Sequence, residues 1–146
     1  MDYLARALEL ARRNTGKTGT NPSVGCVLVK HGRVVGEGMT ALGGRPHSET
    51  QALEMAGGAA RGATAFVTLE PCAHWGQTPP CADALARAGV ARVVVGHIDP
   101  DSRVCGQGVA KLEAAGVEVA VEPRAAIAAF YAGYDATRTR PPGGGV

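Results

Sequence analysis

The chain has 146 residues, of which 45% are hydrophobic and 19% charged, a balance typical of one globular domain and not of a disordered chain. Its net charge of +2 is too small to indicate nucleic-acid binding, and no apolar run reaches the roughly 18 residues of a membrane-spanning helix. The first residues also lack the basic and then apolar segments of a secretory signal. We therefore expect a cytoplasmic protein with no membrane partner.

Hydrophobic spacing and glycine or proline breaks predict alternating helices and strands. In chain order these are a helix over 3–13, a strand hairpin over 24–30 and 33–37, a helix over 48–55, a strand over 65–69, a helix over 81–88, a strand over 92–96, a helix over 107–115, a strand over 117–121 and a helix over 123–134. The alternation predicts an α/β fold in which the hairpin forms an antiparallel edge and the later strands are parallel. Residues 136–146 are rich in proline and glycine, so we expect a flexible tail there.

His47, Cys72 and Cys81 are candidate metal ligands. One histidine and two cysteines can bind zinc and leave the fourth tetrahedral position open for water, as in catalytic zinc sites, whereas structural zinc sites usually have four protein ligands. Glu49 follows the histidine at a spacing that suits a proton carrier. Cys26 lies in an apolar run and is interpreted as a small buried side chain.

The spacing of His47 and Glu49 carries a structural condition. Residues two apart in a helix point about 200° away from each other, so both side chains can reach one water only at the open first turn. Pro46 precedes this pair, and a helical pattern follows it until Gly57, so we expect the helix to begin here.

The loops that follow two of the predicted strands carry polar residues. One loop begins near Cys72 and the other near Asp99. Because ligand sites of such sheets form where loops leave the carboxyl ends of strands, we expect these two residues to lie close together.

Four motifs together resemble the deaminase domain of the bacterial riboflavin-biosynthesis deaminase/reductase, over roughly residues 4–134. The spacing of the cysteines is specific, because related cytidine, tRNA adenosine and guanine deaminases usually carry Pro-Cys-x-x-Cys. Here eight residues separate the two cysteines, and Thr-Pro-Pro precedes the second. The motifs are Asn21-Pro22-x-Val24-Gly25-Cys26, Gly44-x-Pro46-His47-x-Glu49, Thr68-Leu69-Glu70-Pro71-Cys72-x-His74-x-Gly76-x-Thr78-Pro79-Pro80-Cys81 and Asp99-Pro100.

The resemblance implies a three-layer α/β/α cytidine deaminase-like fold with a mixed five-stranded sheet, and a deaminase domain over residues 1–135. It also implies Zn2+ on His47, Cys72 and Cys81, with Glu49 as the proton shuttle. The family substrate is the small pyrimidine 2,5-diamino-6-ribosylamino-4(3H)-pyrimidinone 5′-phosphate, which loses its 2-amino group, and the fold commonly forms dimers or tetramers. The family positions that line the substrate pocket correspond to Asn21, His74, Gln77, Asp99 and Asp101.

The chain departs from the family pattern at a few points. Ser48 stands where alanine is usual, Gln77 where a cation is usual, and Asp101 where asparagine is commoner. The NADPH-dependent reductase domain that usually follows has no counterpart here, so a separate reductase is expected as a partner. Two alternatives remain open: a deaminase of another nucleobase or nucleoside, and a catalytically silent partner subunit of the same fold.

Overall fold

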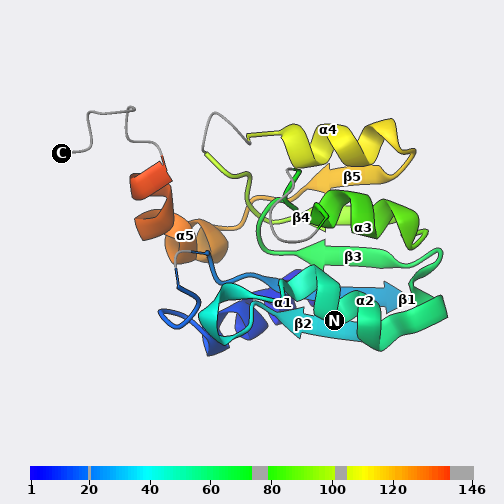
Figure 1. The fold of residues 1–146 in the computed structure, drawn as a ribbon, viewed down its shortest axis with the longest axis horizontal. Helices are drawn as coiled ribbons and strands as arrows, with labels where there is room; N and C mark the ends of the chain where they lie inside the picture. The colour runs from blue at the N-terminus through cyan, green and yellow to red at the C-terminus, as the bar shows by residue number, and fades with distance from the viewer. Residues whose placement is uncertain (20, 74–78, 101–104, 139–146) are drawn as a thin grey trace.

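In the computed structural model, the residues that the structure describes are 1–19, 21–73, 79–100 and 105–138. Their strands form one five-stranded sheet in the order β2-β1-β3-β4-β5 (Figure 1). Strand β1 pairs antiparallel with both β2 and β3, whereas β3, β4 and β5 run parallel. The predicted mixed sheet with an antiparallel hairpin at one edge is confirmed. The strands are β1 (Gly25–Lys30), β2 (Arg33–Met39), β3 (Thr64–Val67), β4 (Arg92–Val95) and β5 (Glu118–Val121).

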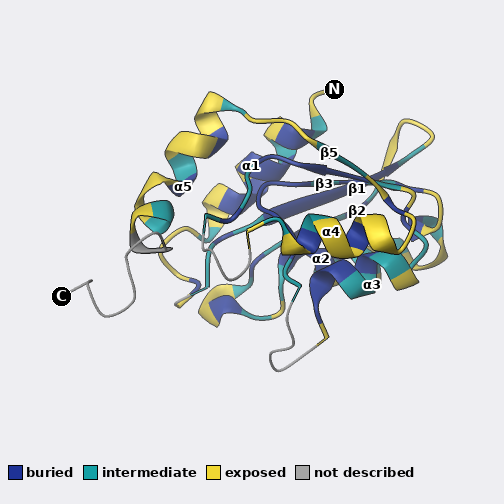
Figure 2. Cartoon of the chain, turned by 90° about the horizontal axis from the view of Figure 1, so that it is seen from above, coloured by how far each residue is buried: buried dark blue, intermediate teal, exposed yellow. Residues whose placement is uncertain are grey.

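Helices cover both faces of the sheet and complete the expected three layers. Helices α2, α3 and α4 pack on one face, while α1 and the first half of α5 pack on the other. Figure 2 shows buried residues along the strands of the sheet and exposed residues on parts of these helices. The helices are α1 (Tyr3–Arg13), α2 (Ser48–Ala56), α3 (Cys81–Arg87), α4 (Gln107–Ala114) and α5 (Ala125–Arg138), with short 3-10 turns η1 (Leu42–Gly44) and η2 (Gly57–Ala60).

The two faces share strand β1, whose side chains alternate between them because successive residues of a strand point to opposite sides. Cys26 and Leu28 pack under α2, α3 and α4, whereas Val27 and Val29 pack under α1. Cys26 is fully buried, as its apolar surroundings in the sequence predict.

The sheet and α2 approach each other closely at the end that carries the site. A Cβ atom at Gly38 in β2 would clash with the carbonyl oxygen of Ser48, so a larger residue there would push the first turn of α2 away. Glycine in this strand therefore sets the height of α2 above the sheet.

Helix α5 differs from its prediction. It begins at Ala125 instead of 123 and continues to Arg138, so residues 136–138, expected in the tail, are helical. Just past Tyr134, Asp135 Oδ2 lies 2.7 Å from the ring Nε2 of His97, and this contact connects the helix to the segment after β4. Residues 139–146, the rest of the expected tail, lie outside the described part. No helix in the described part is both long and apolar enough to cross a membrane.

Candidate active site

His47 and Glu49 lie at the start of α2, where the sequence predicts them. His47 has an extended backbone conformation and occupies the position just before the helix, Ser48 is the first helical residue and Glu49 the second. This turn is open because its backbone N–H groups have no partner within the helix. Both side chains therefore reach the same side of the helix end, and both line one cavity.

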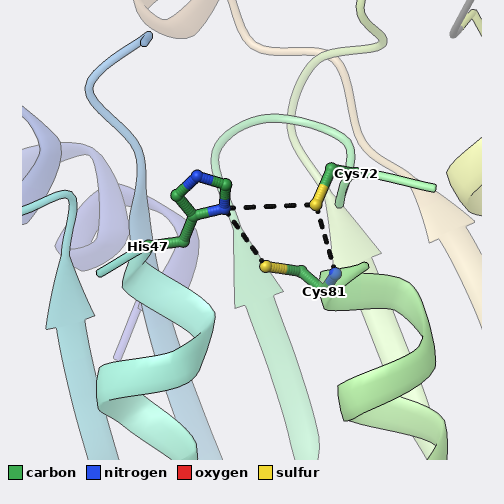
Figure 3. A group of neighbouring side chains, drawn as sticks. All are labelled: His47, Cys72 and Cys81. Atoms are coloured by element: carbon green, nitrogen blue, oxygen red, sulfur yellow. Dashed lines mark hydrogen bonds between the residues drawn. The ribbon is translucent and has the colours of Figure 1, made fainter. Parts of the chain in front are cut away.

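The side chains of His47, Cys72 and Cys81 converge from three segments of the chain (Figure 3). His47 Nδ1 lies 3.4 Å from Cys81 Sγ and 4.0 Å from Cys72 Sγ. The three potential ligand atoms all lie within 4.8 Å of one another. Cys72 follows β3, and Cys81 is the first residue of α3, so the carboxyl end of a strand meets the N-termini of two helices.

The protonation of the two cysteines suits a metal site. The backbone N–H of Cys81 donates a hydrogen bond to Cys72 Sγ at 3.1 Å. Hydrogen bonds from the side chain of Cys81 and from His47 lower the pKa of Cys72 to about 4, whereas the same contact with Cys72 raises the pKa of Cys81. The thiolate is the form of cysteine that binds a metal, so a bound cation would favour loss of both thiol protons. Two sulfurs and an imidazole nitrogen form a donor set that zinc prefers, so these residues fit that metal.

Glu49 is a buried carboxyl group beside these ligands, with only 4% of its surface exposed. Burial raises its pKa because a charged carboxylate is poorly solvated there, and the negative charge of Cys72 raises it further. The hydroxyl of Ser48 donates a hydrogen bond to Glu49 Oε1 at 2.7 Å and opposes this rise. A carboxyl group whose pKa lies above its ordinary value can both accept and return a proton near neutral pH.

A cavity of about 130 Å³ opens in front of these groups. Asn21 and Asp99, which the sequence places in the substrate pocket, both line it together with Cys72. The prediction that Cys72 and Asp99 lie close together is therefore confirmed. His74, Gln77 and Asp101 lie outside the described residues, so their expected roles stay predictions.

Hydrogen bonds hold the two described pocket residues in place. The amide Nδ2 of Asn21 donates to the carbonyl oxygen of Gly44 at 3.0 Å, and Tyr134 donates from its hydroxyl to Asp99 Oδ2 at 2.6 Å. Tyr134 comes from α5, so the last helix reaches the cavity.

Among the cavity residues that sequence reasoning did not assign to the pocket are Arg45, Glu70 and Tyr134. Arg45 stands two positions before His47, and this proximity to the motif is a signal that could have identified it. Glu70 accepts hydrogen bonds from the backbone N–H groups of Gly106 and Val109, each at 3.0 Å, and so anchors the start of α4. No local pattern marks Tyr134.

The comparisons with known proteins agree with this geometry. Residues 1–97 match the family model described as the cytidine and deoxycytidylate deaminase zinc-binding region. The match covers more than half of the chain, so the chain belongs to this family of zinc-binding deaminases.

Similar proteins narrow the family to the riboflavin type. The chain is 57% identical over 117 residues to riboflavin biosynthesis protein RibD of Escherichia coli. The aligned region covers 80% of the chain but only 32% of RibD. It is 48% identical over 115 residues to diaminohydroxyphosphoribosylamino-pyrimidine deaminase of Buchnera aphidicola from Acyrthosiphon pisum, covering 79% of the chain and 78% of that protein. RibD of Acinetobacter baumannii has the same fold, with a TM-score of 0.89 and 46% identity over 94% of the chain and 39% of its own. The chain thus spans about a third of the E. coli relative and most of the Buchnera one.

Proposed function

We propose that this chain is a zinc-dependent aminohydrolase that removes the 2-amino group of 2,5-diamino-6-ribosylamino-4(3H)-pyrimidinone 5′-phosphate and releases ammonia. The observation that carries the proposal is the convergence of His47, Cys72 and Cys81 beside the buried Glu49, at the wall of one cavity. The Buchnera relative, which this chain covers over most of its length, is named for the same deamination and supports the substrate.

The chemistry divides between the metal and the residues of the chain. Zinc held by His47, Cys72 and Cys81 would supply a Lewis acid that lowers the pKa of a bound water toward neutrality. Glu49 accepts a proton from the attacking water and gives it to the departing amino nitrogen. A C–O bond forms at the amidine carbon, the C–N bond breaks, and ammonia leaves behind a carbonyl group.

The remaining cavity residues orient the pyrimidine. The hydrogen bond from Asn21 Nδ2 to Gly44 fixes the plane of the amide and leaves Oδ1 to accept from an N–H group of the substrate. The carboxylate of Asp99, to which Tyr134 donates a hydrogen bond, is a second acceptor group in the cavity wall. His74, Gln77 and Asp101 remain proposed substrate residues on the resemblance alone.

Ammonia release from a panel of substrates tests the proposal. The panel contains the phosphorylated diaminopyrimidine, its dephosphorylated form, cytidine, deoxycytidylate, guanine and a tRNA adenosine stem-loop. We expect the phosphorylated diaminopyrimidine to give the highest kcat/KM. Faster release from a nucleoside or another base would assign a different deaminase, and no release from a zinc-loaded chain would indicate a silent partner subunit.

The partners follow from the resemblance to the deaminase domain of a deaminase/reductase. We propose that a separate reductase acts on the deaminated product. The purified chain is expected to consume no NADPH with that product. We also propose a homo-oligomer, a dimer or tetramer, which light scattering of the purified chain would test.

A further inference from the structure

We propose that Arg45 binds the 5′-phosphate of the substrate and so determines the preference for a phosphorylated pyrimidine. This inference rests on the proposed function and names the residue that forms its phosphate subsite. Among the described residues that line the cavity, Arg45 is the only lysine or arginine. Within the described lining, a doubly charged phosphate therefore meets one cationic side chain.

The acidic groups of the cavity do not neutralise Arg45. Glu49 pairs with Ser48, Glu70 accepts from two backbone N–H groups of α4, and Asp99 accepts from Tyr134. No ion pair within the described part of the chain includes Arg45, whereas other arginines, such as Arg6 with Glu37, are paired. The guanidinium of Arg45 is thus free to pair with an anion from outside the chain.

The position of Arg45 suits the far end of the substrate. It lies two residues before His47 and lines the same cavity, so the Cα atoms of the two residues lie within about 7 Å of each other. The reacting carbon of the pyrimidine must lie next to His47 and Glu49, and the ribose separates that ring from the phosphate. A long side chain displaced from the metal ligands along the cavity wall fits this separation.

Arginine is also the side chain best matched to a phosphate. Its planar guanidinium donates two parallel N–H groups to two phosphate oxygens, and it stays charged at any pH at which the enzyme works. The carboxylates of Glu49, Glu70 and Asp99 repel an anion, so the phosphate needs a cation beside it that is not the metal occupied by the reacting ring. Arg45 supplies it from the segment that also carries the metal ligand His47.

The test compares Arg45→Gln and Arg45→Lys with the unaltered chain on the phosphorylated and dephosphorylated diaminopyrimidines. We expect Arg45→Gln to lower kcat/KM about 10- to 100-fold on the phosphorylated substrate only, mainly through KM, since charged hydrogen bonds contribute that much to binding. Arg45→Lys should retain part of the preference. Arg12→Gln is the matched control. Arg12 is exposed on α1, so this substitution removes the same charge at a position away from the cavity.

Two measurements separate this inference from the proposed function. Equal effects of Arg45→Gln on both substrates, or no effect on either, would overturn the role of Arg45 while the deaminase assignment stands. If the unaltered chain deaminates neither substrate, the proposed function fails. In that case, calorimetry with ribose 5-phosphate tests the role of Arg45 separately. The inference predicts that Arg45→Gln binds ribose 5-phosphate at least about 10-fold more weakly than Arg12→Gln does. Zinc content and the unfolding temperature, measured for every variant, identify any loss of fold.

Discussion

Ser48 and Glu49 are adjacent residues at the start of α2, and both side chains are buried. Burial alone would favour the neutral carboxylic acid, whereas the hydroxyl of Ser48 favours the carboxylate. The balance between these two effects sets the protonation of the group to which we assign proton transfer. We therefore expect Ser48 to act as a positioning residue for Glu49.

Glu49→Gln removes the proton carrier and keeps its size. We expect turnover to fall by at least about 100-fold, because an amide cannot accept and return a proton. Zinc content and the unfolding temperature should stay close to those of the unaltered chain, since Glu49 is not a proposed ligand. Ammonia release at a near-normal rate by this variant would contradict the mechanism.

Ser48→Ala tests the hydrogen bond to Glu49. The bond stabilises the carboxylate, so its loss raises the pKa of Glu49, and the base form is then lost at a higher pH during acidification. The acidic limb of the kcat/KM profile should move to higher pH by up to about one unit, the equivalent of one hydrogen bond. Acidic limbs that coincide in the two proteins would show that Ser48 does not influence Glu49.

At the scale of the elements, Glu70 connects the loop after β3 to the N-terminus of α4. Both of its carboxylate oxygens accept backbone N–H groups that the first turn of α4 leaves without partners. The contact is close, because a Cβ atom at Gly108 would clash with the carbonyl oxygen of Pro71. Helix α4 thereby supports the segment that carries Cys72.

Glu70→Ala should lower the free energy of unfolding by about 1–3 kcal/mol, since it removes a helix cap and leaves two donors without partners. Glu70→Gln, which keeps one acceptor oxygen, should lose less. Urea denaturation monitored by circular dichroism measures both variants. Equal stability of the alanine variant and the unaltered chain would show that α4 does not depend on this anchor.

The features that could be predicted depend on residues close together in the sequence, whereas those that could not depend on contacts between residues far apart in it. The start of α2 could be predicted because Pro46 and the helical pattern after His47 lie next to each other in the chain. The proximity of Cys72 and Asp99 followed from a rule about parallel strands. The contact between Asp135 of α5 and His97 could not be predicted, because it joins residues 38 apart. Tyr134 reaches the cavity for the same kind of reason, through a partner 35 residues away.

At the scale of the molecule, the proposed zinc ligands join segments that the chain brings together only in the folded state. His47 lies just before α2, Cys72 follows β3 and Cys81 begins α3, so the unfolded chain has no preformed site. A metal that binds only the folded state adds its binding free energy to the stability of the fold. We therefore expect metal binding at the proposed site to stabilise this end of the sheet.

Removal of the metal should consequently lower the unfolding temperature. A ligand present at about 1,000 times its dissociation constant stabilises the folded state by about 4 kcal/mol, and about 2–4 °C corresponds to each kcal/mol in a chain of this size. We expect a chelator to lower the midpoint by about 10 °C in differential scanning fluorimetry, and added zinc to restore it. Cys72→Ala, which lacks one proposed ligand, should unfold at the lower temperature from the start and respond weakly to either reagent. An unaltered chain whose midpoint is the same with and without chelator, while elemental analysis shows that zinc has been removed, would separate metal binding from the stability of this fold.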